Sequence, residues 1–98
     1  MPNLFIFVKY NIQMFSFITI KEVQEEFGEW CKSLRKNEKM TQQELAEQLA
    51  VSRITIANLE KGKNFTIDTF LKVMQYFGQL EKINQFIKST IIYSQSFY

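Results

Sequence analysis

Two short amphipathic segments separated by only three residues constrain the fold of this chain more than any other feature. The first covers residues 42–49 and the second residues 53–61, with Ala50, Val51 and Ser52 between them. Three residues are too few for any connection except a tight corner between two helices. The chain must therefore fold in a way that supports this corner.

Both segments are preceded by a residue that can cap a helix. Thr41 is followed by Glu44 three residues later, a spacing that forms a capping box in which two orphan backbone amides are satisfied reciprocally. Ser52 is placed to cap the second helix. The spacing of the apolar residues predicts a buried face, formed by Leu45, Ala46, Leu49, Val51, Ile56 and Leu59. An exposed helix that begins with Arg, Thr and Asn can read base edges.

The same residues carry a resemblance to a known family. They are Thr41, Gln42, Glu44, Leu45, Ala46, Val51, Ser52, Ile56 and residues 59–62, Leu-Glu-Lys-Gly. This pattern resembles the helix-turn-helix of the lambda-repressor-like, Cro and XRE group of bacterial and phage regulators. The resemblance covers residues 22–77 and implies an all-α fold, a compact domain of five helices. One residue departs from the family, which usually has Gly in the turn where this chain has Ala50, a residue that disfavours positive φ.

Three further amphipathic helices are expected around the corner. Thr19 and Glu22 repeat the capping-box spacing and predict a helix that ends near Asn37. Thr66 is predicted to cap a fourth helix that stops at Gly78. A last apolar stripe predicts a fifth helix, from about residue 79 to residue 90.

The helical domain is expected to cover residues 19–91. It is preceded by an apolar extension, residues 1–18, and followed by an aromatic tail, residues 92–98. The extension is β-prone by composition and predicts one or two short strands. The alternative is that Met14 is the true start, so that residues 1–13 are upstream sequence or a disordered tail.

The extension fits neither a secretory signal nor a membrane span. It has no charged region before the apolar run and no small-residue cleavage site after it, and polar residues interrupt the run. In the aromatic tail, Tyr93, Phe97 and Tyr98 either pack onto the domain or contact a partner.

The composition excludes several classes of function. The chain has no His and a single Cys, Cys31, so it has no His base, no internal disulfide and no multi-cysteine metal site. We therefore expect no enzyme, no metal and no cofactor, and we expect Cys31 to be a small buried hydrophobe. The net charge of +2 does not indicate a nucleic-acid binder, so the distribution of charge has to support that function.

The resemblance assigns roles to individual residues. The side chains expected at base edges in the major groove are Arg53, Ile54, Thr55 and Asn58. Those placed for phosphate contacts are Gln42, Gln43, Ser52, Lys61, Lys63 and Asn64. In the family, an Arg at the position of Arg35 commonly pairs with the Glu that is Glu60 here, which ties the first helix to the recognition helix.

The leading hypothesis is a sequence-specific transcriptional regulator that binds double-stranded DNA as a homodimer. It is expected in the bacterial cytoplasm, associated with the nucleoid and not with a membrane. A second hypothesis is an antitoxin-type autoregulator whose aromatic tail or apolar N-terminus binds a partner toxin. A third is a protein-interaction domain that has lost DNA binding, which a gel-shift panel would separate from the other two.

Overall fold

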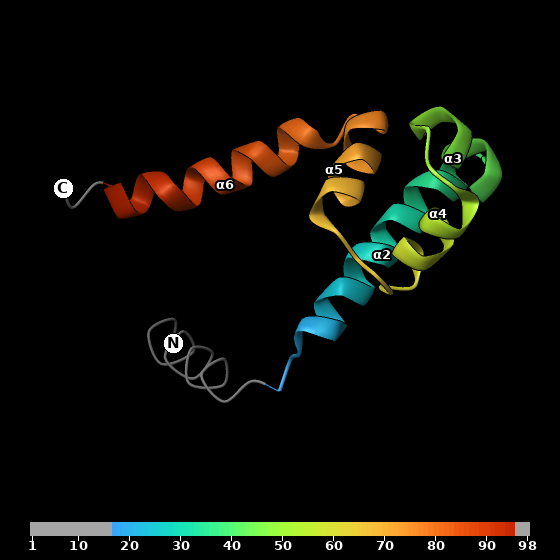
Figure 1. Ribbon diagram of the computed structural model, residues 1–98. Coiled ribbons are helices and arrows are strands. Elements are labelled where there is room, and N and C mark those ends of the chain that lie inside the picture. The colour runs from blue at the N-terminus through green and yellow to red at the C-terminus, as the bar shows by residue number, and fades with distance from the viewer. Residues whose placement is uncertain (1–16, 96–98) are drawn as a thin grey trace.

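The computed structural model describes residues 17–95, and all regular secondary structure within them is α-helical. The helices in chain order are α2 (Ile20–Asn37), α3 (Gln42–Leu49), α4 (Arg53–Glu60), α5 (Ile67–Tyr76) and α6 (Leu80–Gln95), as Figure 1 shows. The predicted all-α fold with five helices is therefore confirmed. The strands or tail predicted for residues 1–18 lie outside the described residues except at residues 17–18, which form no strand, and residues 96–98 lie outside them as well.

The start of α2 is fixed by side-chain caps. The backbone amide of Thr19 donates to Glu22 Oε2 at 3.1 Å, and the amide of Glu22 donates to Thr19 Oγ1 at 3.0 Å. This is the predicted capping box, and α2 ends at Asn37 as predicted. At the other end of the domain, α5 is capped by Thr66 and is stopped by Gly78 at φ 71°.

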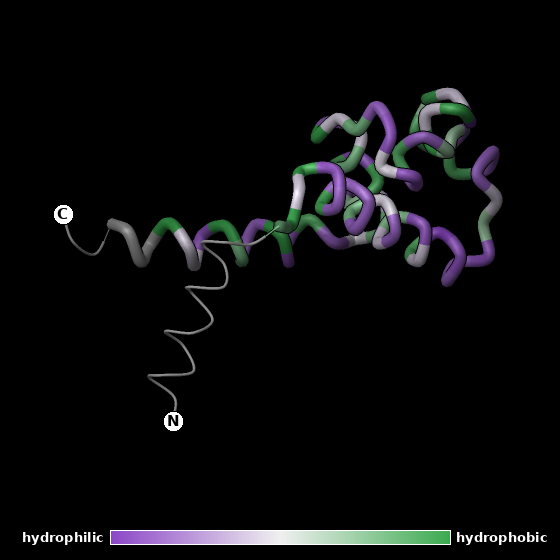
Figure 2. The backbone as a smooth tube through the Cα atoms, turned by 90° about the horizontal axis from the view of Figure 1, so that it is seen from below, coloured by the Kyte–Doolittle hydropathy of each residue, from purple (hydrophilic) through white to green (hydrophobic). Residues whose placement is uncertain are grey.

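Helix α6 is longer than expected. It begins at Leu80 and continues to Gln95, whereas the sequence predicted an end near residue 90. Residues 91–95 contain no Gly or Pro to stop a helix, so the backbone of the predicted tail continues the helix as far as Gln95. The helix projects from the other four in Figure 1, and hydrophobic and hydrophilic segments alternate along it in Figure 2. The side chains of Tyr93, Phe97 and Tyr98 lie outside the described residues.

The core lies where α2, α3, α4 and α5 meet. Its fully buried side chains include Leu45 of α3, Ile56 of α4, and Val73 and Met74 of α5. A second group is aromatic and contains Phe27, Trp30, Phe65 and Phe70, with the rings of Phe27 and Phe70 centred 4.6 Å apart. The aromatic group packs α2 against α5, and the aliphatic group holds α3 and α4.

Within residues 17–95, no helix combines the length and the apolar character that crossing a membrane requires. In α2, the longest helix described, charged residues occur throughout the sequence.

Candidate nucleic-acid interface

The corner between α3 and α4 is built by two caps and one left-handed residue. At the start of α3, the amide of Thr41 donates to Glu44 Oε1 at 2.8 Å and the amide of Glu44 donates to Thr41 Oγ1 at 3.0 Å. The chain then turns at Ala50, which has φ 57° and ψ 42°. The amide of Val51 donates to the carbonyl of Ala46 at 3.0 Å and closes the helix end.

Ala50 takes the backbone conformation in which this family usually has glycine. A left-handed conformation costs a residue with a Cβ roughly 1–2 kcal/mol. The departure from the family pattern therefore leaves the turn geometry intact and costs stability instead.

Ser52 fixes the direction in which α4 leaves the turn. Its Oγ accepts the amide of Thr55 at 3.1 Å and lies 2.8 Å from Thr55 Oγ1. Both hydroxyls, one a candidate phosphate ligand and the other a candidate base contact, are thus partnered within the chain. Their remaining hydrogen-bonding capacity is available to a ligand.

The outer face of α4 presents a cation and an apolar side chain. Arg53 is exposed, Ile54 is 61% exposed, and Asn58 is half-buried one turn further along. On the opposite face, Ile56 and Leu59 are buried in the core. Burial of this inner face fixes the rotation of α4 about its axis, so Arg53 and Ile54 remain on the surface.

The loop after α4 adds two more cations. The carbonyl of Asn58 accepts the amide of Lys61 at 3.1 Å and that of Lys63 at 2.8 Å, which folds the loop back onto the helix end. Gly62 and Asn64 both have positive φ, at 75° and 48°. The side chains of Lys61, Lys63 and Asn64 are exposed.

The side-chain amides of the two glutamines at the start of α3 already donate hydrogen bonds within the chain, which was not predicted from the sequence. Gln42 is half-buried, and its Nε2 donates to Glu60 Oε1 at 3.0 Å. Gln43 is exposed, and its Nε2 donates to Glu47 Oε2 at 3.0 Å. Each amide has a second N–H, so each can still donate to an anion.

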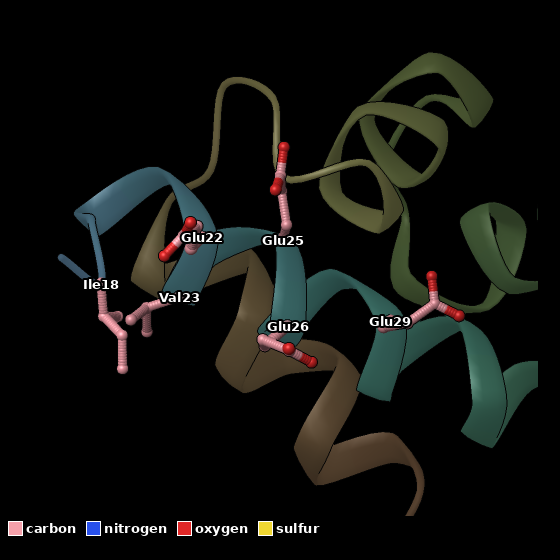
Figure 3. Close-up of a pocket in the computed structure, with 6 residues that line it drawn as sticks. All are labelled: Ile18, Glu22, Val23, Glu25, Glu26 and Glu29. Atoms are coloured by element: carbon pink, nitrogen blue, oxygen red, sulfur yellow. The ribbon is translucent and has the colours of Figure 1, made fainter.

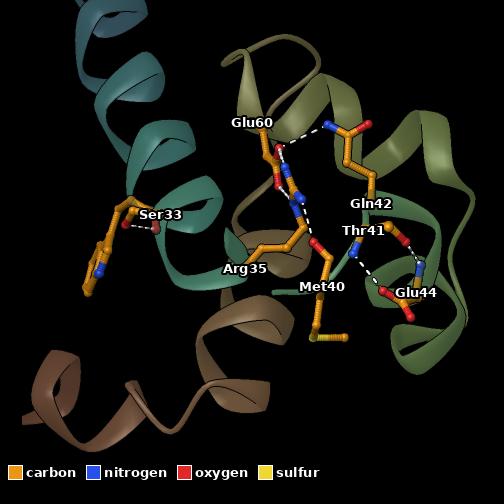
Figure 4. A network of polar contacts seen from close by, with 8 residues as sticks. Ser33, Arg35, Met40, Thr41, Gln42, Glu44 and Glu60 are labelled. Atoms are coloured by element: carbon orange, nitrogen blue, oxygen red, sulfur yellow. Dashed lines mark hydrogen bonds and ion pairs between the residues drawn. The ribbon is translucent and has the colours of Figure 1, made fainter. Parts of the chain in front are cut away.

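An ion pair between Arg35 and Glu60 joins α2 to the end of α4. Arg35 Nε lies 2.7 Å from Glu60 Oε2 and Nη2 lies 3.0 Å from Oε1, so the contact is bidentate. Arg35 Nη1 also donates to the carbonyl of Met40 at 2.7 Å. Figure 4 shows Glu60 between Arg35 and Gln42, so helices α2, α3 and α4 meet at one carboxylate.

Burial strengthens this contact, because the side chains of Arg35 and Glu60 are only 8% and 3% exposed. The hydrogen bonds to Glu60 raise the pKa of the Arg35 guanidinium above its ordinary value, so it stays charged. Burial, together with the nearby Glu60 charge, raises the pKa of the Cys31 thiol to about 12. Cys31 is therefore an unreactive core residue at neutral pH, as expected.

Two glycines let α2 and the end of α4 approach backbone to backbone. A Cβ on Gly28 would lie 2.5 Å from the carbonyl oxygen of Leu59 and 2.6 Å from that of Glu60. A Cβ on Gly62 would lie 2.9 Å from the backbone of Glu25 in α2. The role of Gly28 was not predicted from the sequence, although a glycine inside an amphipathic helix is itself a sign of close packing.

Comparisons with known proteins agree with this geometry. The profile of a family described as "helix-turn-helix domain" matches residues 28–88, well over half of the chain. The chain is also similar to the HTH-type transcriptional activator BcrR of Enterococcus faecalis, with 42% identity over 52 residues. The match covers 53% of this chain and 26% of BcrR, so the chain spans about a quarter of that relative's length.

Proposed function

The chain belongs to the helix-turn-helix domain family, and on this premise we propose that it is a sequence-specific regulator that inserts α4 into the major groove of double-stranded DNA. The family is one of DNA-binding regulators and not of enzymes, which confirms the expectation that the chain is no enzyme. BcrR is described as a transcriptional activator.

One observation supports the proposal above the others: the first turn of α4 displays Arg53 and Ile54 to solvent while its opposite face is buried. Arg can bind guanine O6 and N7 with two parallel hydrogen bonds, and an apolar side chain can contact a thymine methyl group. Asn58, one turn later, suits adenine. Thr55 lies between them and keeps part of its hydrogen-bonding capacity.

Phosphate contacts are assigned to the polar residues around α4. Lys61, Lys63 and Asn64 form one group after the helix, and all three are exposed. The second group precedes it and consists of Gln42, Gln43 and Ser52. Contacts of this kind set the register of the protein on DNA and give the affinity its salt dependence.

We assign a homodimer as the binding form, located in the cytoplasm. One α4 offers a few base contacts, each worth roughly 1–3 kcal/mol of discrimination. Two copies related by a twofold axis double that number and match a palindromic site with half-sites about one helical turn apart. In a footprint, the unaltered protein should protect two such half-sites.

Two substitutions separate base reading from phosphate binding. Arg53→Ala should relax the preference at one base position in each half-site, at a cost of about 1–3 kcal/mol on the preferred site. Lys63→Ala should weaken binding to all sequences alike and reduce the salt slope by about 0.9 per subunit. Titrations of preferred and scrambled duplexes at several salt concentrations measure both effects.

The matched controls are one conservative substitution at position 53 and one substitution of an exposed cation in a different helix, α6. Arg53→Lys keeps the charge but loses the bidentate geometry, so it should also relax the base preference. Lys88→Ala removes an exposed cation from α6 and should change neither affinity nor slope. If Arg53→Ala weakened binding to preferred and scrambled DNA equally, Arg53 would be a phosphate ligand and not a base contact.

A further inference from the structure

Glu60 holds the side chain of Gln42, a glutamine that the proposed function assigns to a DNA phosphate. Oxygen Oε1 of Glu60 accepts a hydrogen bond from Gln42 Nε2 at 3.0 Å and another from Arg35 Nη2 at 3.0 Å. Oxygen Oε2 accepts one from Arg35 Nε at 2.7 Å. The side chain of Glu60 is only 3% exposed, so it cannot contact DNA itself. An effect of Glu60 on DNA binding must therefore act through a neighbouring residue.

The chemistry of the carboxylate fixes the direction of the Gln42 amide. An ionised carboxylate only accepts hydrogen bonds, so Gln42 must turn its nitrogen and not its oxygen toward Glu60. Figure 4 shows this arrangement, with Gln42 Nε2 joined to Glu60 and the amide oxygen directed away from it. The nitrogen of a primary amide carries two N–H groups, so one N–H stays free for a ligand. Because the first N–H is held, the second has a fixed direction.

The negative charge of Glu60 does not oppose a phosphate, because Arg35 neutralises it in a bidentate contact. The carboxylates at the start of α2 differ in this respect. Four of them are exposed and line one open depression (Figure 3); they are Glu22, Glu25, Glu26 and Glu29. Exposed like charges gathered in this way repel a phosphate. A buried, paired carboxylate can therefore support a phosphate ligand where an exposed one could not.

We propose that Glu60 is a positioning residue for DNA binding, which holds Gln42 so that its free N–H meets a phosphate. The inference rests on the proposed function, which places Gln42 among the phosphate ligands. A free glutamine side chain loses rotamer freedom when it binds, and this loss reduces affinity. A side chain that is already held in the free protein avoids the loss. Holding one side chain in this way is worth roughly 2- to 10-fold in affinity per subunit.

Gln43 provides a matched comparison on the same turn of α3. It is exposed, and its Nε2 donates to Glu47 of its own helix at 3.0 Å. The direction of its amide therefore does not depend on Glu60. Both glutamines are assigned to phosphates, so a displacement of the whole of α3 would change the contribution of both. Loss of the contact with Glu60 would change that of Gln42 alone.

NMR relaxation of the side-chain amides tests the positioning in the unaltered protein without DNA. The order parameter of the Gln42 side-chain N–H groups should exceed about 0.6 and approach the value of about 0.85 that is typical of rigid backbone. A value below about 0.6 would show that the side chain is free before DNA binds, and it would overturn the proposal. This measurement needs no substitution, so it does not depend on the folding of a variant.

Affinities for the preferred duplex test whether this order serves DNA binding. Two backgrounds remove the ion pair and differ only at position 60. Arg35→Met with Glu60→Gln keeps an acceptor for Gln42, whereas Arg35→Met with Glu60→Leu does not. Gln42→Met should cost more affinity in the first background than in the second, by roughly 2- to 10-fold per subunit. Gln43→Met should cost the same in both, with every titration made below the melting temperature of the variant.

An equal cost of Gln42→Met in the two backgrounds would overturn the proposal, since the acceptor at position 60 would then make no difference. A cost of Gln43→Met that changed in parallel would overturn it too, because α3 as a whole would have moved. Arg53→Ala, measured on the same duplexes, keeps the two claims apart. If it relaxed the base preference while the cost at Gln42 stayed equal, only the positioning role would be rejected. A protein with no preferred duplex would reject the proposed function and the positioning role together.

Discussion

Replacing Glu60 by alanine should lower the free energy of unfolding by about 3 kcal/mol, because the Arg35 guanidinium then stays buried without its counter-charge. The loss also removes the acceptor for Gln42 and with it one hydrogen bond that joins α3 to the end of α4. Denaturant titration of the variant against the unaltered protein measures the change. Glu29→Ala, on the exposed side of α2, is the control and should change stability by about 0.5 kcal/mol or less.

A double-mutant cycle separates the pair from the individual side chains. Arg35→Met combined with Glu60→Leu leaves no buried charge, so we expect it to be more stable than either single substitution. The coupling energy should then exceed about 1 kcal/mol, since the two groups share a buried contact. Coupling below about 0.5 kcal/mol would place both groups in contact with solvent and would remove the ion pair as a support of α4.

Substituting Gly28 by alanine should destabilise the protein by about 2 kcal/mol despite the better helix propensity of alanine. The added Cβ would meet the carbonyl oxygens of Leu59 and Glu60 at 2.5 and 2.6 Å, and backbone atoms cannot rotate away as a side chain can. This steric clash can be relieved only if α2 moves away from α4. DNA affinity should fall too, because the same shift displaces the proposed base-reading face of α4.

Glu29→Ala is the matched control for this substitution also, since it adds alanine to the neighbouring position of α2 without entering the contact. Thermal melts of both variants measure the loss of stability. DNA titrations below the melting temperature of each variant measure whether the folded protein still holds α4 in position to bind DNA. An alanine at position 28 that left stability equal or raised it would contradict the close approach of α2 and α4.

Local features of this fold were predictable from the sequence, because they depend on residues close together in the chain. The capping boxes at Thr19 and Thr41 need only three residues each, and both are present. Helix α3 has the predicted bounds, and α4 ends one residue earlier, with Lys61 as its cap. The apolar stripes predicted the buried faces of both helices.

Features that depend on contacts between distant segments were harder to predict. The glycine at position 28 signals close packing, but its partner, the end of α4, lies about 30 residues away and no local pattern identifies it. The bond from Gln42 to Glu60 likewise requires the three-dimensional fold. The end of α6 was misplaced because nothing in residues 91–95 stops a helix, and the aromatic composition suggested a tail. The DNA contacts remain predictions.

Selection from a random duplex library tests most directly whether α4 reads DNA sequence. The unaltered protein should enrich a palindromic site and, at physiological salt, bind it at least about 10³-fold more tightly than a scrambled duplex of equal length. The protein displays Arg53 and Ile54 on a helix whose rotation is fixed by buried Ile56 and Leu59. If selected and scrambled duplexes bound equally, the claim would be contradicted, and the fold would be serving as a protein-interaction domain instead.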